Sequence, residues 1–579
     1  MAVEAPSKAQ AIPRVAPRRT ARASAESPLL VRERGRGLIA NPYLNKGTAF
    51  SERERDLFEL RGLLPPRVTS IAEQVSLELE HVRRKGDDLE KYIGLAALQD
   101  RNETLFYRVL SENLEEFLRI VYTPTVGRAC QDFSHILRRP RGAWITPDDV
   151  GRIDEILRTA GGLDTRLIVV TDNERILGLG DQGAGGMAIP VGKLALYSAA
   201  AGIHPALTLP VSLDVGTDRR ELLDDPLYIG YRAPRLRGEM YDRVIEAFVE
   251  AVRRVFPAAV LQWEDFKQHN ALRILDRYRH RLPSFNDDIQ GTGAVVLGGL
   301  LAARGGVESL SDDRFLLLGA GAAGIGIARM LERRLGSPFA NAASPRLVMV
   351  DSHGLVHAGR ATLNDDQLPF AADPSWIGDA GLDERGLLDP AGIARAMRAT
   401  VLIGTTGTPG AFTEPLVRQV AANVSTPIVL PLSNPGDRAE AQPCDIDAWT
   451  DGRALIATGS PFEPLPGRLL GQANNVFIFP GVGLGSLVAQ AREVTDDAFL
   501  VAADALAASV TRERLASGGI YPPTSDLRAI AGRIAEAVVG RMRDTGYGRQ
   551  FRDEDIAPAV DDAMWAPDYV PYEPLIEER

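Results

Sequence analysis

The residues best suited to chemistry in this sequence are two pairs of neighbouring acids, Glu264 with Asp265 and Asp287 with Asp288. The first pair directly follows the apolar run 257–263, which predicts a buried strand. Because open α/β sheets bind ligands at the carboxyl ends of their strands, we expect this pair to lie in a ligand site. The predicted helix after it, about 14 residues long, rises ~21 Å, and about six extended residues return ~20 Å. The second pair is therefore expected beside the first.

Four carboxylates in one place repel one another unless they are protonated or neutralised by a cation. A set of ligands made only of oxygen atoms suits a hard ion such as Mg²⁺ or Mn²⁺. The alternative is that each pair consists of ordinary solvated loop acids. Spacing alone leaves both interpretations open.

Lys193 and Tyr122 are the other residues whose setting suggests proton transfer. Pro190 is typical of the first turn of a helix, and it places Lys193 in that same turn. The positive end of a helix dipole disfavours a cation, so we expect the pKa of Lys193 to be lowered, as suits a general base. Tyr122 precedes a Thr-Pro turn, which fixes its backbone. The alternatives are a lysine whose head reaches water and a tyrosine that packs in the core or caps a helix.

Two stretches match the Gly-x-Gly-x-x-Gly pattern of dinucleotide sites. In the first, residues 178–183, Asp181 would bring a second negative charge to a pyrophosphate, although Asp214 ends the next predicted strand, where a ribose-binding acid could stand. In the second, residues 319–324 follow the apolar strand 314–318, and a helix is predicted from position 325 onward.

The second stretch is the better candidate for a dinucleotide site. Its loop is uncharged, and Asp351 ends the next strand 27 residues past Gly324. This is the order of a Rossmann βαβ unit, with pyrophosphate at the helix N-terminus and the acid on a ribose. Further strand-like runs, 400–403, 427–431 and 454–457, extend the parallel sheet.

Helical patterns flank these sheets. Residues 51–120 carry apolar side chains three or four apart, with a break at the two prolines 65 and 66, and residues 484–543 predict two helices broken near 518–523. Residues 1–38 are rich in Ala, Arg, Ser and Pro and are expected to be disordered. Aromatic residues near the C-terminus suggest packing on the body or on a second subunit.

Composition narrows the class of protein. The net charge of -11 disfavours nucleic acid or an anionic membrane as a partner. Two cysteines, Cys130 and Cys444, cannot form a disulfide framework, which fits a reducing compartment. The longest apolar run has 11 residues, too few to cross a bilayer. We therefore expect a soluble, cytoplasmic protein with no membrane span.

Several long motifs resemble the malic enzyme family, over roughly residues 41 to 570. Besides the Rossmann loop they are Tyr-Thr-Pro-Thr-Val-Gly at 122–127, Thr-Asp-Asn-Glu-Arg-Ile-Leu-Gly-Leu-Gly-Asp-Gln-Gly at 171–183, Ile-Pro-Val-Gly-Lys-Leu at 189–194, Trp-Glu-Asp-Phe at 263–266, Phe-Asn-Asp-Asp-Ile-Gln-Gly-Thr at 285–292, Leu-Ser-Asn-Pro at 432–435 and Asn-Asn-Val-Phe-Ile-Phe-Pro-Gly at 474–481. The resemblance implies oxidative decarboxylation of (S)-malate to pyruvate and CO₂ with NAD(P)⁺ and Mn²⁺ or Mg²⁺. It also implies a homodimer or homotetramer.

The resemblance assigns roles to individual residues. It implies Glu264, Asp265 and Asp288 as metal ligands, Lys193 as general base supported by Asp287, Tyr122 as general acid, Arg175, Asn434 and Asn474 on malate, and Gly319, Gly321, Ala322, Ala323, Gly324, Asp351 and Asn434 on the dinucleotide. It also assigns the first glycine loop to the substrate domain.

The predicted fold is α/β, with a Rossmann-type doubly wound NAD(P) domain, an α/β substrate domain and an N-terminal helical region. The expected parts are a disordered tail 1–38, the helical region 39–140, the substrate and metal domain 141–288 completed by helices in 476–545, the Rossmann domain 289–475 and a C-terminal tail 546–579.

Asp351 would repel the 2′-phosphate of NADP, so we expect NAD as the cofactor, with NADP as the alternative. Two other functions remain open at this point. One is a malolactic enzyme, which converts malate to L-lactate and CO₂ with bound NAD. The other is a dinucleotide-binding protein without catalytic activity.

Overall fold

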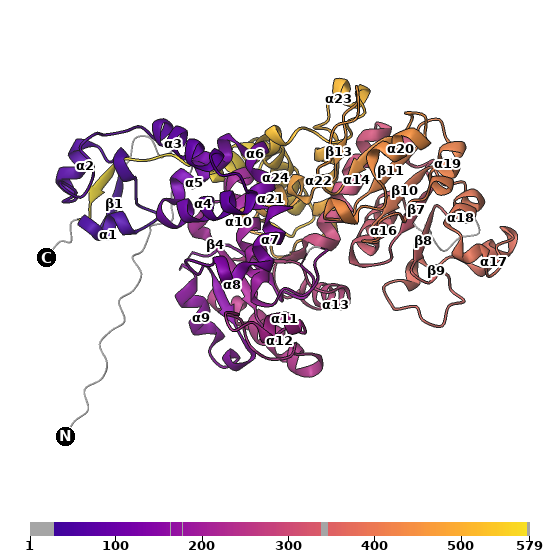
Figure 1. Cartoon of the computed structure of the whole chain (residues 1–579), viewed down its shortest axis with the longest axis horizontal. Coiled ribbons are helices and arrows are strands. Elements are labelled where there is room, and N and C mark those ends of the chain that lie inside the picture. The colour runs from indigo at the N-terminus through magenta and orange to yellow at the C-terminus, as the bar shows by residue number, and fades with distance from the viewer. Residues whose placement is uncertain (1–27, 163, 177, 337–344, 576–579) are drawn as a thin grey trace.

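The structure is a computed structural model that describes residues 28–162, 164–176, 178–336 and 345–575. Its elements form three parts (Figure 1). The N-terminal helices lie at one end of the molecule, a first parallel sheet with its helices lies in the middle, and a second parallel sheet lies at the other end. No helix in the described part of the chain is long and apolar enough to cross a membrane.

The N-terminal region is helical, as predicted. Its helices are α1 (Gly35–Ala40), α2 (Glu52–Leu57), α3 (Ile71–Arg83), α4 (Asp88–Arg101), α5 (Glu103–Glu112), α6 (Leu114–Val121), α7 (Thr125–Gln131) and α8 (Phe133–Ile136). Ser51 and Ser70 begin α2 and α3 with reciprocal capping boxes, which satisfy backbone N–H groups that the first turn leaves without partners. The predicted proline break lies between these two helices.

The end of the predicted disordered tail is ordered. Strand β1 (Leu29–Val31) pairs in parallel with β14 (Tyr572–Pro574), and α1 follows it; residues 1–27 lie outside the described residues. The buried Lys46 is ion-paired with Glu54 and donates a hydrogen bond to the carbonyl of Val570 at 2.6 Å. These contacts fix the C-terminal segment, which also contains α25 (Asp553–Ala563), on the body of the molecule.

The middle sheet is entirely parallel and has the order β2-β4-β3-β5-β6. Its strands are β2 (Ala143–Ile145), β3 (Leu167–Thr171), β4 (Thr208–Leu213), β5 (Val260–Trp263) and β6 (Ser284–Asn286), and its main helices are α9 (Ile153–Ala160), α10 (Ala188–Ala201), α12 (Gly238–Val255) and α13 (Gln268–Tyr278). Strands β5 and β6 are neighbours, so their carboxyl ends lie side by side as predicted.

The second sheet has the order β13-β12-β11-β10-β7-β8-β9 and is parallel except for β9. Its strands are β7 (Phe315–Leu318), β8 (Leu347–Asp351), β9 (Gly354–Leu355), β10 (Val401–Gly404), β11 (Ile428–Pro431), β12 (Leu455–Thr458) and β13 (Gly471–Gln472). The order reverses between β7 and β10, which is the switch point where doubly wound sheets bind dinucleotides. The α/β prediction, with its Rossmann-type sheet, is confirmed.

The C-terminal helices differ from the prediction of two helices. They are α21 (Phe479–Val488), α22 (Asp496–Ala507), α23 (Arg512–Ala516) and α24 (Leu527–Asp544). Helices α21 and α24 pack on α10 of the substrate domain, while α22 packs on α14 (Thr292–Arg304), which precedes the second sheet. The C-terminal helices therefore contact both parts instead of completing the substrate domain alone.

His204 makes folding sensitive to pH. Its ring lies 4.9 Å from that of Trp565, and Nδ1 accepts a hydrogen bond from the N–H of Ala206 at 3.2 Å. Burial lowers the pKa of His204 from 6.5 to about 4, so the folded protein holds a neutral ring that the unfolded chain would protonate at mildly acidic pH. The stability that this ring contributes is complete above pH 6.5 and is lost as the pH falls toward 4.

Between pH 6.5 and 4 we expect the free energy of unfolding to fall by up to about 3 kcal/mol on this account. Contact of the ring with solvent makes the fall smaller. The midpoint of urea unfolding, measured across this pH range, reports the fall. His204→Asn keeps a side-chain acceptor but cannot be protonated, so its midpoint should fall less than that of the wild type. If the unfolding midpoints of the two proteins fell by the same amount between these pH values, the assignment of a buried neutral histidine would be contradicted.

Candidate active site

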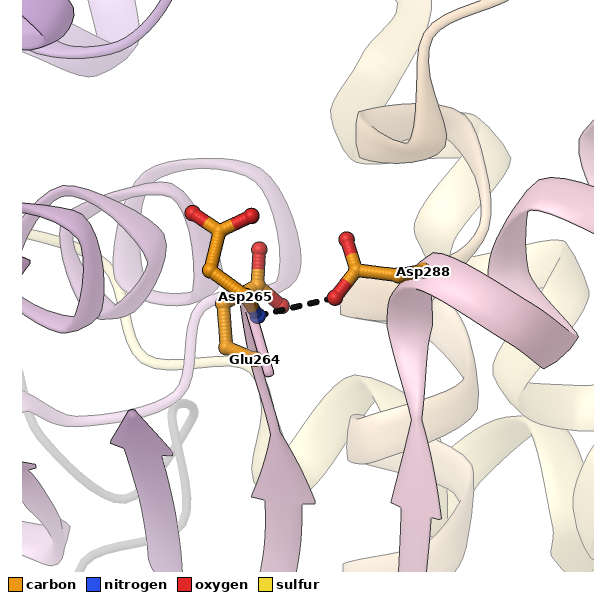
Figure 2. A group of neighbouring side chains, drawn as sticks. All are labelled: Glu264, Asp265 and Asp288. Atoms are coloured by element: carbon orange, nitrogen blue, oxygen red, sulfur yellow. Dashed lines mark hydrogen bonds between the residues drawn. The ribbon is translucent and has the colours of Figure 1, made fainter. Parts of the chain in front are cut away.

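The four predicted acids meet at the carboxyl ends of two neighbouring strands. Glu264 and Asp265 follow β5, and Asp287 and Asp288 follow β6. Figure 2 shows Glu264 and Asp265 on one strand end with Asp288 facing them from the next. The N–H of Asp265 donates to Oδ2 of Asp288 at 2.8 Å and links the two ends.

Three of these acids form a group that could hold a metal ion. One carboxylate oxygen from each of Glu264, Asp265 and Asp288 lies within 4.8 Å of the others. Asp265 has a φ of 56°, a left-handed conformation that costs free energy in a non-glycine residue and is often found at functional sites. Anionic oxygen ligands suit Mg²⁺ or Mn²⁺. The residues present therefore fit the divalent cation that the sequence predicts.

Lys193 lies against this group. Its Nζ forms an ion pair with Asp287 and another with Glu264, at 2.9 Å from Oε1. All three side chains are almost completely buried. The fourth acid, Asp287, therefore contacts the lysine, as the resemblance implies, and is not among the three that could hold the metal.

Two predictions about Lys193 are wrong. Helix α10 begins at Ala188, so Pro190 lies in its first turn but Lys193 lies one turn later, where the dipole at the helix N-terminus has little effect. The predicted fall in pKa is also reversed. Burial acts to lower the pKa of Lys193, but the carboxylates of Asp287 and Glu264 outweigh burial and raise it well above its ordinary value.

Tyr122 directly follows α6 and lies beside the lysine. Nζ of Lys193 is 5.3 Å from the centroid of the Tyr122 ring, and the tyrosine is buried. Burial raises the pKa of Tyr122 well above its ordinary value, so its hydroxyl keeps its proton at neutral pH. The site thus holds a protonated phenol beside a lysine.

The acids are themselves perturbed. Burial raises the pKa of Glu264 well above its usual range, and burial likewise raises that of Asp288 to about 6. Four neighbouring acids with one lysine leave an excess of negative charge whenever the acids are ionised. A bound divalent cation would offset that charge.

Two residues that contact these acids are not among those assigned to the site from the sequence. Nε2 of Gln262 donates to Oε2 of Glu264 at 2.7 Å, and the hydroxyl of the buried Tyr197 donates to Oε1 of Gln262. Gln262 lies two positions before Glu264, in an apolar strand. A polar residue at that spacing shares a face of the strand with Glu264, and this signal could have identified it.

Asn475 is the second of these residues; of the two neighbouring amides in the sequence, only Asn474 was assigned to the site. Its Nδ2 donates to Oδ2 of Asp287 at 3.1 Å and to Oγ1 of Thr292 at 3.1 Å. The predicted substrate residue Asn474 instead accepts from the N–H of Val476 at 3.0 Å and caps the turn that follows. The sequence gives no local signal that separates these two neighbouring amides.

The other predicted substrate residues come from two different sheets. Arg175, in the loop after β3, has an exposed side chain, and its N–H donates to the carbonyl of Asp265 at 3.1 Å. Asn434 follows β11, and its Oδ1 accepts from the hydroxyl of Ser460. The structure thus places Arg175 next to a predicted metal ligand and Asn434 on the dinucleotide sheet.

The predicted dinucleotide loop has the geometry of such a site. Gly319 has a φ of 114°, and a Cβ on Gly324 would collide with the carbonyl of Gly319. Gly321 begins helix α16 (Ala322–Leu335), which starts three residues earlier than predicted and includes Ala322 and Ala323. The N-terminus of α16 therefore points its free N–H groups toward the place where a pyrophosphate would bind.

Asp351 ends β8, as predicted, and is not isolated. Both of its oxygens accept from Nη2 of Arg360, at 3.0 and 3.1 Å, and one also accepts from the N–H of His353 at 2.8 Å. The position of the carboxylate is therefore fixed. Nε2 of Gln268, at the start of α13, donates to the carbonyl of Ala320 at 3.1 Å and joins the two domains at this loop.

The rival assignment of Asp214 to a ribose is not supported. Its carboxylate accepts from the N–H groups of Gly216 and Tyr231, at 3.3 and 2.7 Å, and is buried. Both donors lie in the segment between β4 and α12, as the assignment of this region to the substrate domain requires.

Comparison with known proteins covers both halves of the chain. The family model for the malic enzyme N-terminal domain matches residues 99–279, and the model for the malic enzyme NAD-binding domain matches residues 289–542. A protein of Vibrio campbellii named NAD-dependent malic enzyme is 44% identical over 556 residues, which is 94% of this chain and 98% of that protein. One of Pseudomonas aeruginosa with the same name is 45% identical over 560 residues, 95% of this chain and 99% of the other.

Solved structures show the same fold. Malic enzyme of Entamoeba histolytica aligns with a TM-score of 0.55 at 24% identity, covering 80% of this chain and 87% of that one. The malic enzyme of Pyrococcus horikoshii aligns with a TM-score of 0.52 at 24% identity, covering 78% and 89%.

Metal binding tests the group of three acids. We expect Glu264→Gln and Asp288→Asn each to weaken Mn²⁺ binding by about tenfold or more, because each removes an anionic oxygen ligand. The free Mn²⁺ remaining in solution, measured by electron paramagnetic resonance, gives the affinity. Asp214→Asn is the matched control, since it changes a buried acid of the same domain outside the group. Equal affinities in all these variants would contradict the assignment.

Proposed function

Because this chain belongs to the malic enzyme family, we propose that it oxidises (S)-malate to pyruvate and CO₂ with NAD⁺, using Mn²⁺ or Mg²⁺ held by Glu264, Asp265 and Asp288. The observation that carries the proposal is the contact of Lys193 with Asp287 and Glu264, at the edge of a group of acids that fits a divalent cation. The naming of full-length relatives as NAD-dependent malic enzymes supports it.

In this proposal Lys193 is the general base. Its Nζ accepts the proton of the C2 hydroxyl of malate. When Glu264 serves as a metal ligand, its charge no longer holds the ammonium form of Lys193, and the lysine can more easily give up its proton. Asp287 then remains as the partner that holds the lysine in place.

When bound, NAD⁺ would take up the hydride from C2, and a divalent cation held by the three acids would stabilise negative charge on the substrate oxygens. Breakage of the C3–C4 bond releases CO₂, and the proton held by Lys193 passes to the C2 oxygen to give the enol form of pyruvate. Tyr122 donates its phenolic proton to C3 of that enol, and the enol hydroxyl proton returns through Lys193 to the tyrosine. Burial raises the pKa of Tyr122 while the charge of Lys193 acts to lower it, and the phenol is protonated at neutral pH, as a general acid must be.

Three side chains hold the substrate in the proposal. Arg175 offers a planar, permanently charged fork to a carboxylate of malate. Asn434 and Asn474 bind through side-chain amides, which orient a carboxylate without adding charge. In the proposal Asn434, which follows β11, also contacts the cofactor.

NAD is the proposed cofactor. It would contact the loop from Gly319 to Gly324 and the carboxylate of Asp351, which can accept a hydrogen bond from a ribose 2′-hydroxyl. That same carboxylate would repel the 2′-phosphate of NADP. A cytoplasmic location and a homodimer or homotetramer remain part of the proposal.

The reaction itself is tested by mixing the protein with malate, Mn²⁺ and either NAD⁺ or NADP⁺. We expect NADH to form together with an equal amount of pyruvate, more rapidly than NADPH. Chelation of the metal should stop turnover, and added Mn²⁺ should restore it. Lactate formed without NADH would instead identify a malolactic enzyme, and no product with either cofactor would contradict the proposal.

Separate variants distinguish the two proton transfers. Lys193→Ala should lower turnover by about 10²- to 10⁴-fold, the usual contribution of a general base. It should also abolish the burst, which is the rapid formation of NADH in the first turnover before the steady state. Tyr122→Phe should keep that burst, because hydride transfer precedes the step at C3, while steady turnover falls.

Stopped-flow absorbance measures both phases. Tyr107→Phe is the matched control, since Tyr107 is equally buried in the same helical region but is not assigned to the site. Normal steady turnover in Tyr122→Phe would remove Tyr122 from the mechanism.

A further inference from the structure

The glycine-rich loop of the substrate domain, residues 178–183, contains a carboxylate, that of Asp181, which accepts hydrogen bonds from the protein itself. Oδ1 of Asp181 accepts from the N–H of Gly183 at 2.9 Å, and Oδ2 accepts from the N–H of Asp218 at 3.1 Å. Arg235 donates to both oxygens, from Nη2 at 2.7 Å and Nε at 2.9 Å. Asp181 thus takes the hydrogen bonds that a bound anion would otherwise take.

Arg235 joins both ends of a longer loop, of which residues 172–176 and 178–183 are described. Besides the fork on Asp181, its Nη1 donates to the carbonyl of Asp172 at 2.7 Å. Its side chain is only 1% exposed. A buried guanidinium with three separate acceptors is held in one orientation, because any other would leave its charge without partners.

The start of this loop is also fixed. The hydroxyl of Tyr241, on α12, donates to Oδ2 of Asp172 at 2.6 Å, and Oδ1 of Asp172 accepts from the N–H of Glu174 at 3.1 Å. Both anchors, Asp172 and Asp181, therefore connect to the segment that leads into α12 or to α12 itself.

Between the two anchors the loop touches both halves of the proposed site. The N–H of Arg175 donates to the carbonyl of Asp265 at 3.1 Å. Farther along, Gly178 lies so close to the carbonyl of Asn434 that a Cβ there would collide with it. The loop therefore contacts a proposed metal ligand on one sheet and a proposed substrate residue on the other.

We infer that Arg235 is a positioning residue for malate: through Asp181 and Asp172 it holds the loop in the shape that presents Arg175 to a substrate carboxylate and seats Gly178 against Asn434. The inference rests on the proposed function, because it takes Arg175 and Asn434 as malate-binding residues. Arg235 touches neither substrate nor cofactor in this account. Its loss alters the binding of the dicarboxylate far more than that of the dinucleotide, because the other proposed contacts of the dinucleotide, residues 319–324 and Asp351, follow or end strands β7 and β8 of the second sheet.

Arg235→Lys is the informative variant. Lysine keeps the positive charge, but its single ammonium cannot contact the two oxygens of Asp181 and the carbonyl of Asp172 in the same directions. Arg304→Lys is the matched control. Arg304 forms the same fork on Asp313, at 2.7 and 2.8 Å, and also donates to a backbone carbonyl, that of Thr426 at 3.1 Å.

Steady-state kinetics of the full-length enzyme with malate, NAD⁺ and Mn²⁺ tests the inference. In Arg235→Lys we expect the KM for malate to rise by about tenfold or more, as a displaced binding group requires, while the KM for NAD⁺ stays within about twofold. In Arg304→Lys both constants should match those of the wild type. Asp181→Asn removes the charge of the partner while keeping its shape, and it should reproduce the effect of Arg235→Lys even if that variant fails to fold.

Amide hydrogen exchange gives a measurement that does not depend on turnover. The amides of Gly183 and Asp218, which donate to Asp181, should exchange faster in Arg235→Lys than in the wild type or Arg304→Lys. If the wild type oxidises malate but the KM for malate is unchanged in Arg235→Lys and Asp181→Asn, the role of Arg235 is overturned and the proposed function stands. A rise in the KM for malate in Arg304→Lys equal to that in Arg235→Lys would also overturn it. A wild type that does not oxidise malate overturns the proposed function and this role with it.

Discussion

Lys193 is buried between two carboxylates, and its charge is what allows four acids to lie together in the core of a folded protein. A buried ammonium and a buried carboxylate are each costly to desolvate, and each becomes tolerable only through the other. Two further side-chain partners of these acids, Gln262 and Asn475, are neutral amides. Neutral donors orient a carboxylate without cancelling the negative charge that attracts a cation. The same acids therefore serve both the proposed metal site and the lysine, since Glu264 belongs to the group that could hold the metal and also contacts Lys193.

Strands buried on both faces were the easiest elements to predict from the sequence. Runs such as 315–318 and 401–404 are apolar throughout, so the Rossmann-type sheet and the neighbouring ends of β5 and β6 followed from local pattern. The pKa of Lys193 did not, because its direction depends on Asp287 and Glu264, which are distant in sequence and outweigh burial. Nor did the pairing of β1 with β14, since strands of three residues carry no period. Asn475 received no role because the sequence does not say which of two adjacent amides contacts Asp287.

The two glycine loops show how one pattern serves two purposes. In 319–324 the loop carries no charge and its helix N-terminus remains available to an anion. In 178–183 the aspartate at the fourth position, Asp181, accepts a hydrogen bond from the N–H of Gly183 in the same loop, and the buried Arg235 donates to the same carboxylate. Spacing of glycine sets the path of the backbone in both, but the charge of a single intervening side chain decides whether the loop receives a ligand or becomes a rigid support.

The pairing of β1 with β14 has a consequence for how the molecule is made. A ribosome releases the chain from its N-terminus, and early segments generally begin to fold before later ones exist. The small core of Val31, Phe50 and Phe58 is closed by Tyr572. It therefore stays open until β14 has been made, and it exposes apolar side chains until then. A nascent chain cut short before β14 would keep that surface exposed, where chaperones and proteases can bind it.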